Sequence, residues 1–264
     1  MSAQPQEQQP VLLREERDGI ATLTMNRPQQ MNLLSNEMLS ALQDSLDDIS
    51  RSKNIRVVVL AAAGKGFCAG HDLKEIRALG DQAKIAELFA KCSKMMMTIH
   101  KLPQPVIAKV QGAAAAAGAQ LVAQCDLAVA SDAAKFVTSG VTWGFFCSTP
   151  GVSIGRNLQR KHAMEMLLTG EPISAQRALE WGLVNKVAAA GALDGETLSL
   201  AQTIASKPPA TVAEGKRAFY QQMDLDLPRA YALASQVIAA SFAHEEGLEG
   251  MAAFIEKRPP PGKK

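Results

Sequence analysis

The chain has 264 residues, of which 47% are hydrophobic and 20% charged, a composition typical of a globular protein and unlike that of disordered, collagen-like or coiled-coil chains. Its 28 Lys and Arg residues nearly balance its 26 Asp and Glu residues, so the formal charge is only +2. This net positive charge is too small for sequence-independent electrostatic binding to a polyphosphate backbone, and we therefore expect no nucleic-acid partner.

The cysteines and the start of the chain indicate an intracellular protein without a metal site. The four cysteines are Cys68, Cys92, Cys125 and Cys147. They lie too far apart for a zinc-binding pair, which predicts free thiols in a reducing compartment. Residues 1–10 form a polar leader without secretory-signal features, and no apolar run of about 18 residues follows it. We expect a cytoplasmic protein with no membrane partner; for a eukaryotic source the mitochondrial matrix stays open, although no transit peptide is visible.

The first half of the chain alternates apolar runs with helical patterns, as an α/β protein does. Asp18-Gly19 is a turn dipeptide between two short strands, which predicts a β-hairpin. Ser35 is the expected N-cap of the helix that follows. In chain order the predicted strands are 11–14, 20–25, 56–62, 106–110 and 127–130, and the predicted helices are 36–49, 82–100 and 120–124. The sequence therefore predicts a buried sheet with βαβ connections.

The second half of the chain is predominantly helical. The predicted helices are 163–168, 174–181, 198–206, 210–223 and 229–242. Lys207-Pro208-Pro209 breaks the pattern and predicts a boundary there. We therefore expect a disordered leader (1–10), a core domain (11–206), a C-terminal helical region (207–258) and a disordered tail (259–264).

Two loops rich in small residues follow predicted strands. Residues 65–74 come after one buried strand, and residues 112–118 come directly after another. Ligands of α/β sheets bind at strand C-termini, where small residues let a ligand approach the backbone. Ala117, at the expected start of a helix, is placed to stabilise a developing oxyanion with its N–H. Taken alone, an alanine-rich turn is also consistent with close helix packing.

Five longer segments together resemble the crotonase superfamily, also called the enoyl-CoA hydratase/isomerase family. The segments are NRPQQMNLLS (26–35), KGFCAGHDLKEI (65–76), GAAAAAGAQLVAQCDLAVA (112–130), LLTGEPISAQRALEWGLVNKV (167–187) and EGMAAFIEKRPP (249–260). The resemblance implies an α/β fold with a core of repeated ββα turns in a spiral and a C-terminal helical trimerisation region. It also implies a homotrimer or dimer of trimers that takes a coenzyme A (CoA) thioester as substrate, with no permanently bound cofactor.

The same resemblance implies which residues contact the thioester. The backbone N–H groups of His71 and Ala117 would hold the thioester carbonyl oxygen. For CoA itself the resemblance points to Lys65, Ala69, Lys74, Phe254 and Lys257, the last two from the same or a neighbouring subunit. Without the motif, each lysine would read as a solvated surface residue.

Two positions depart from the pattern of the hydratases in this family. Gln120 and Gly140 occupy the places of the two glutamates that position and activate water. Neither residue can act as a carboxylate base, which disfavours ordinary two-glutamate hydration. If the pocket is otherwise intact, restoring glutamate at both positions is expected to raise hydratase activity.

Three other side chains are candidates for the acyl site. A histidine beside the oxyanion site, as at His71, is similar to the AGHD pattern of a decarboxylase of the superfamily, but His71 would also be explained by a hydrogen bond to Asp72 or solvent. Cys147 and Ser148 lie where other members place a tyrosine or an acid. A nucleophilic Cys147 would need a lowered pKa, and a buried inert thiol is the competing interpretation.

The sequence therefore predicts an enzyme that processes acyl-CoA thioesters through an oxyanion-stabilised enolate. Decarboxylation and thioester hydrolysis are the alternative reactions, because the two hydratase glutamates are missing. A non-catalytic acyl-CoA binding protein is the alternative from another class.

Overall fold

The structure is a computed structural model that describes residues 9–259. Most of the predicted leader and of the predicted tail lies outside these residues.

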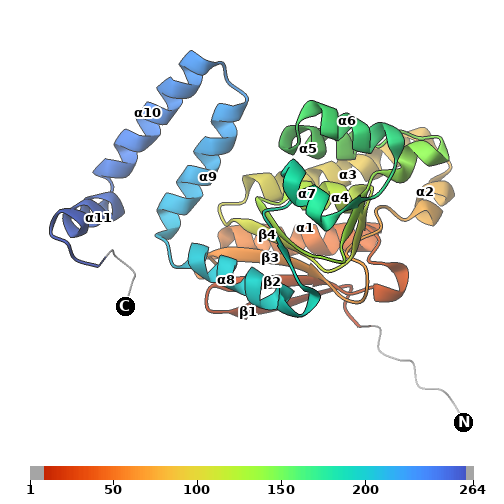
Figure 1. The fold of residues 1–264 in the computed structure, drawn as a ribbon, viewed down its shortest axis with the longest axis horizontal. Coiled ribbons are helices and arrows are strands. Elements are labelled where there is room, and N and C mark those ends of the chain that lie inside the picture. The colour runs from red at the N-terminus through yellow and green to blue at the C-terminus, as the bar shows by residue number, and fades with distance from the viewer. Residues whose placement is uncertain (1–8, 260–264) are drawn as a thin grey trace, which may run out of the picture.

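A six-stranded sheet forms the centre of the body (Figure 1). Its strands, in spatial order, are β1 (Leu12–Arg17), β2 (Ile20–Met25), β3 (Val57–Ala62), β4 (Val106–Val110), β6 (Leu127–Ser131) and β9 (Lys186–Ala188). β1 and β2 pair antiparallel from Leu12 opposite Met25 to Arg17 opposite Ile20, which confirms the predicted hairpin around Asp18-Gly19. The remaining neighbours pair in parallel, as βαβ connections require.

A second, three-stranded sheet carries one of the two small-residue loops. It consists of β5 (Ala113–Ala115), β7 (Lys135–Val137) and β8 (Ile173–Ser174), with β7 in the middle. None of these strands was predicted, because two or three residues are too few to show an alternating pattern. The sequence 112–118 is thus part strand and part helix rather than a simple turn.

Helices cover both faces of the six-stranded sheet. The helices before the C-terminal region are α1 (Asn36–Arg51), α2 (Leu73–Leu79), α3 (Gln82–Lys101), α4 (Ala117–Gln124), α5 (Ser148–Asn157), α6 (Arg160–Thr169), α7 (Ala175–Trp181) and α8 (Leu193–Ala205), with 3-10 turns η1 (Pro28–Gln30), η2 (Ser139–Trp143) and η3 (Ala190–Ala192). Ser35 caps α1 by accepting a hydrogen bond from the Met38 N–H, as predicted. α8 packs on one face through a small apolar core that includes Val57 and Ile107, and the larger core lies on the other face.

Four helices differ from the predicted pattern. α4 begins at Ala117, three residues earlier than predicted, and α8 begins at Leu193 instead of Leu198. α5 was not predicted, because Pro150 and Gly151 stand in its first turns, although proline is tolerated near a helix N-terminus. α2 is only seven residues long and has no buried residue, so it shows no amphipathic pattern.

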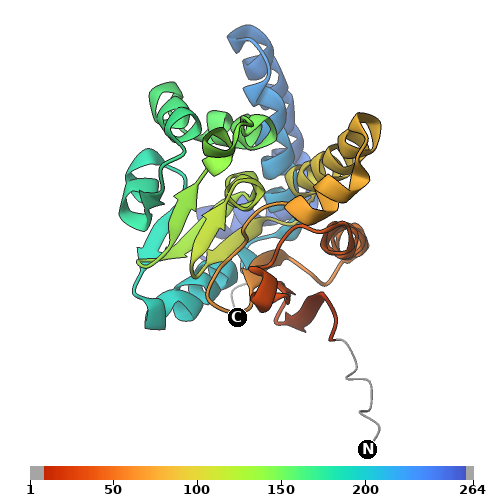
Figure 2. The same cartoon turned by 90° about the vertical axis from the view of Figure 1, so that its right-hand side faces the viewer.

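The C-terminal helices lie to one side of the body. They are α9 (Pro209–Met223), α10 (Leu227–Ala243) and α11 (Glu245–Ile255). Figure 1 shows them beside the body, and in Figure 2, which looks from the other end, they lie behind it. α9 begins at Pro209, the last residue of the predicted break, and the Lys216 ammonium joins it to the body by donating to the Asp126 carboxylate at 2.6 Å.

Candidate active site

The two small-residue loops lie directly against each other. The Phe67 N–H donates to the Ala113 carbonyl at 2.9 Å, and the Ala115 N–H donates to the Cys68 carbonyl at 2.8 Å. A Cβ atom on Gly118 would lie 2.1 Å from that Cys68 oxygen, and one on Gly112 would lie 1.9 Å from the Lys65 carbonyl oxygen. Glycine at these two positions therefore permits the backbones to touch.

The orientation of the peptide group between Gly70 and His71 is fixed by a hydrogen bond. The Gly70 carbonyl accepts from the Leu34 N–H at 2.8 Å. Because a trans peptide is planar, its C=O and N–H point in opposite directions. The His71 N–H therefore points away from Leu34, and within residues 9–259 it donates to no protein acceptor.

The peptide group between Ala116 and Ala117 is oriented in the same way by α4. The Ala116 carbonyl accepts from the Gln120 N–H at 3.0 Å, the first hydrogen bond of the helix. The Ala117 N–H therefore points out of the helix N-terminus, and it too has no protein acceptor among the described residues. Ala116 has φ 48° and ψ −114°, a strained conformation for a residue with a side chain.

Gly70 brings these two peptide groups together. A Cβ atom built on Gly70 would lie 3.3 Å from the Ala117 nitrogen and 3.1 Å from the Ala115 carbonyl oxygen. Two unpaired N–H groups, one at a helix N-terminus, thus occupy one junction. Neither N–H donates to a protein acceptor among the described residues, so both can donate to a ligand oxygen that carries developing negative charge.

The His71 imidazole is an unpartnered polar group next to this junction. Both ring nitrogens are buried and make no hydrogen bond with any residue of 9–259. The ring packs edge-on against Phe89 at 4.9 Å between centroids. The predicted hydrogen bond to Asp72 is wrong, because that carboxylate caps α2 by accepting from the N–H groups of Lys74 and Glu75.

Burial lowers the pKa of His71, since the charged ring loses more hydration than it recovers from its surroundings. The unfolded chain then takes up a proton at this position before the folded protein does. The stability from the neutral ring is present above pH about 6.5 and is lost as the pH falls through the lower pKa of the folded state.

We therefore expect wild-type protein to lose more stability than His71→Leu when the pH is lowered from 7 to 5. Urea unfolding of both proteins at the two pH values measures the difference. His100, whose pKa is also lowered by burial, is present in both proteins and cancels in the comparison. An equal loss in the two proteins would contradict the prediction.

Gln120 and Gly140 lie in well-packed surroundings. Gln120 is 4% exposed on α4, and its Oε1 is buried without a hydrogen-bond partner among residues 9–259. Gly140 is buried in η2, where a Cβ atom would lie 2.6 Å from the Phe145 carbonyl oxygen and 2.8 Å from the Cys147 sulfur. A side chain at position 140 would thus collide with the Phe145 backbone, which argues against restoring a glutamate there; the expected gain in hydratase activity from glutamate at both positions stays a prediction.

The structure places Cys147 and Ser148 at the N-terminus of α5. Burial raises the pKa of the Cys147 thiol despite a backbone hydrogen bond from Gly140 that opposes the shift. The thiol form predominates, which favours the inert-thiol interpretation over a nucleophile. The Ser148 hydroxyl donates to the Phe146 carbonyl at 3.4 Å. A catalytic part for either side chain stays a prediction.

The residues predicted to bind CoA fall into two groups. Lys65 and Lys74 stand at the two ends of the first loop and are exposed, and Ala69 between them is partly exposed. Phe254, 86% exposed, and Lys257 lie at the end of α11. Figure 1 places α11 and α2 at opposite ends of the longest axis, so Phe254 on α11 and Lys74 on α2 lie far apart within one chain.

Sequence reasoning missed two side chains that support the first loop. The amides of Asn32 and Gln111 donate to backbone carbonyls between Ala62 and Gly66. The only local signal was that asparagine is among the residues that best tolerate a positive φ.

Two kinds of feature are absent from the part of the chain that the structure describes. Residues 9–259 hold no group of three or more His, Cys, Asp or Glu side chains placed to bind a metal ion. They also hold no helix with the length and apolarity needed to span a membrane.

The sheet topology, the helical C-terminal region and the paired loops define the crotonase fold, the class predicted from the sequence. The chain belongs to the enoyl-CoA hydratase/isomerase family, whose model matches residues 15–264. An enoyl-CoA hydratase structure from Mycobacterium smegmatis is similar with a TM-score of 0.94 and 50% identity, over 96% of this chain and 98% of that one.

Human enoyl-CoA hydratase domain-containing protein 3 is also similar. Its crystal structure has a TM-score of 0.92 at 46% identity, over 95% of this chain and 99% of that one. The curated human sequence, described as mitochondrial, is 48% identical over 243 residues, which are 92% of this chain and 80% of that protein.

Proposed function

We propose that the protein processes acyl-CoA thioesters by holding the thioester oxygen, as an enolate develops, between the N–H groups of His71 and Ala117. The observation that carries the proposal is that two peptide groups, Gly70–His71 and Ala116–Ala117, lie close together, and that the N–H of each has no protein acceptor among the described residues. Such donors stabilise the charge that appears on the oxygen, and each is worth about 3 kcal/mol in the transition state.

The reaction most compatible with these residues is not ordinary hydration. Water addition needs a group that removes a proton from water, and Gln120 and Gly140 carry no carboxylate. An enolate-stabilising site without a base can still serve a reaction whose substrate supplies the electron pair itself.

A decarboxylation is therefore the favoured alternative, and the buried polar groups support it. Breaking the bond to a carboxylate releases CO₂ and leaves the electron pair as the enolate, which a proton from solvent then quenches. The neutral His71 ring can donate one hydrogen bond to such a carboxylate, and the unpartnered Gln120 Oε1 can accept one from a polar acyl group or water. Thioester hydrolysis is the other alternative, with Ser148 or Cys147 as candidate side chains.

We further propose that CoA binds between copies of the chain. Phe254 and Lys257 of one copy would join Lys65, Ala69 and Lys74 of another in a homotrimer or dimer of trimers. The large apolar side chains exposed on α9, α10 and α11 support such contacts; they include Phe219, Met223, Leu227, Tyr231, Ile238, Phe242, Leu248 and Ile255. The cytoplasm remains the predicted location, with the mitochondrial matrix as the alternative that the description of the human relative favours.

A substrate panel tests the proposal. Purified protein is offered crotonyl-CoA, malonyl-type CoA esters and saturated acyl-CoAs, and acetoacetyl-CoA serves as a probe whose bound enolate is detected by its near-ultraviolet absorbance. We expect enolate formation with acetoacetyl-CoA and turnover of a carboxylated ester above that of crotonyl-CoA. Efficient crotonyl-CoA hydration would overturn the interpretation of Gln120 and Gly140. Tight binding without enolate or turnover would instead establish the non-catalytic acyl-CoA binding protein.

A further inference from the structure

We propose that Asn32 and Gln111 are positioning residues that set the direction of the His71 N–H through the loop preceding it. We call these two side-chain amides the amide clamp. The inference rests on the proposed function, because it concerns how one of the two donors is held. The carrying observation is that amides from two separate segments converge on the same backbone carbonyl of the first loop.

Asn32 is the more buried half of the amide clamp. Its side chain is 0% exposed, and its Nδ2 donates to the carbonyl oxygens of Ala63 at 2.9 Å and Gly66 at 3.0 Å. Its Oδ1 accepts from the Arg27 N–H at 2.9 Å. Both amide hydrogens and the carbonyl oxygen are therefore in use, which makes the geometry of this side chain unusually well defined.

Gln111 approaches the same loop from the end of β4. Its Nε2 donates to the carbonyl oxygens of Ala62 at 3.0 Å, Gly64 at 3.1 Å and Gly66 at 2.9 Å. The Gly66 carbonyl thus receives both amides. Three segments far apart in sequence, around residues 32, 64 and 111, are joined at this point.

The clamp is connected to the His71 peptide group by two hydrogen bonds on either side of Asn32. The Met31 carbonyl accepts from the Ala69 N–H at 3.0 Å, and the Leu34 N–H donates to the Gly70 carbonyl at 2.8 Å. The second of these bonds is the one that points the His71 N–H away from Leu34. Segment 31–34 can hold that bond in place only while it stays fixed relative to the loop.

The backbone of this segment needs the clamp to remain in its conformation. Met31 and Asn32 both have φ 51°, in the left-handed region, where a residue with a side chain pays a conformational cost. Such a conformation persists when surrounding contacts stabilise it, and the three hydrogen bonds of the Asn32 side chain do so here. Without them the segment can relax and carry Leu34 away from Gly70.

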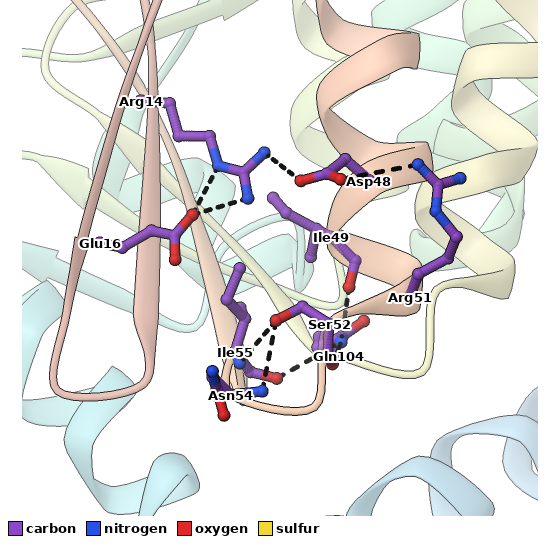
Figure 3. Close-up of polar contacts among 9 residues, drawn as sticks. All are labelled: Arg14, Glu16, Asp48, Ile49, Arg51, Ser52, Asn54, Ile55 and Gln104. Carbon is purple, nitrogen blue, oxygen red and sulfur yellow. Dashed lines mark hydrogen bonds and ion pairs between the residues drawn. The ribbon is translucent and has the colours of Figure 1, made fainter.

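The chain offers a matched control at the opposite end of strands β3 and β4. Gln104 is also a buried amide, and its Nε2 donates to the carbonyl oxygens of Ile49, Ser52 and Ile55, between α1 and the start of β3 (Figure 3). Like Gln111, it has a buried Oε1 with no partner among the described residues. It makes the same kind of clamp, but on a loop that carries no proposed donor.

The test compares Asn32→Gly and Gln111→Met with Gln104→Met. Glycine at position 32 keeps the left-handed backbone accessible and removes the side chain with all three of its hydrogen bonds. For each purified protein, the dissociation constant of acetyl-CoA and the enolisation of bound acetoacetyl-CoA at saturation are measured, together with thermal unfolding. We expect all three variants to lose stability and to bind acetyl-CoA within about 3-fold of wild type, as expected where binding contacts are unchanged.

Enolisation should separate the variants. A donor misplaced by about 1 Å can cost about 100-fold, and we expect a loss approaching that size for Asn32→Gly and Gln111→Met but no change for Gln104→Met. Equal losses in all three variants, or no loss in the first two, would overturn the proposal. If Asn32→Gly does not fold, Gln111→Met decides alone. Failure of wild-type protein to enolise acetoacetyl-CoA would instead refute the proposed function itself.

Discussion

Ala117→Pro, introduced together with Ala116→Gly, is expected to lower turnover or enolisation by about 100- to 1,000-fold, the loss typical when one oxyanion donor is removed. Proline lacks the N–H, and the first residue of a helix is where proline is best tolerated. Ala117 is the first residue of α4, so no hydrogen bond within the helix is lost. The measurement is the rate on the best ester of the panel, or enolisation of acetoacetyl-CoA.

The companion change at position 116 is needed for a steric reason. The Cδ of a proline clashes with the Cβ of a preceding residue that is not extended, and Ala116 has φ 48° and ψ −114°. Glycine removes that Cβ and relieves the strain of the positive φ. Ala116→Gly alone is the matched control and should keep its activity. Equal activity in the control and the double variant would rule out the Ala117 N–H as a donor.

Glutamate at position 140 is expected to destabilise the protein by at least about 3 kcal/mol, because it combines overpacking with a buried, unpaired carboxylate. The collision involves the backbone oxygen of Phe145, which cannot move aside as a flexible side chain would. Urea unfolding of Gly140→Glu measures the loss.

A control variant shows whether the loss of stability comes from the surroundings of position 140 or from the glutamate itself. Gly155→Glu places the same side chain on α5, where an added Cβ atom would have no neighbour within 4 Å, and we expect the free energy of unfolding to change by no more than about 0.5 kcal/mol.

Gln120→Glu is nearly isosteric, and because it adds one carboxylate without a collision, we expect it to raise crotonyl-CoA hydration. A double variant, Gln120→Glu with Gly140→Glu, that hydrated faster than Gln120→Glu alone would show that the η2 region can rearrange.

Local sequence patterns were sufficient wherever the controlling forces are local. The strand at 106–110, the hairpin around Asp18-Gly19 and the cap at Ser35 appear as predicted, because side-chain periodicity, turn preferences and capping each depend on a few neighbouring residues. The resemblance then placed both small-residue loops in one family, and the family assignment is confirmed.

The start of α4 could not be predicted from local sequence signals. No helix-capping side chain marks Ala116, and its positive φ is unusual for alanine. The conformation is held by a hydrogen bond from its N–H to the Val137 carbonyl, on a strand too short to be predicted. The helix therefore begins where a distant strand fixes the backbone.

The sequence by itself determined the class of protein, the two loops and the absence of carboxylates at positions 120 and 140. Only the tertiary structure decided the direction of the His71 and Ala117 N–H groups, the lack of space at Gly140 and the convergence of the Asn32 and Gln111 amides on Gly66. The physical reason is that residue types and periodicity are written along the chain, whereas the orientation of a peptide group and the free volume around a glycine depend on atoms brought close from distant positions.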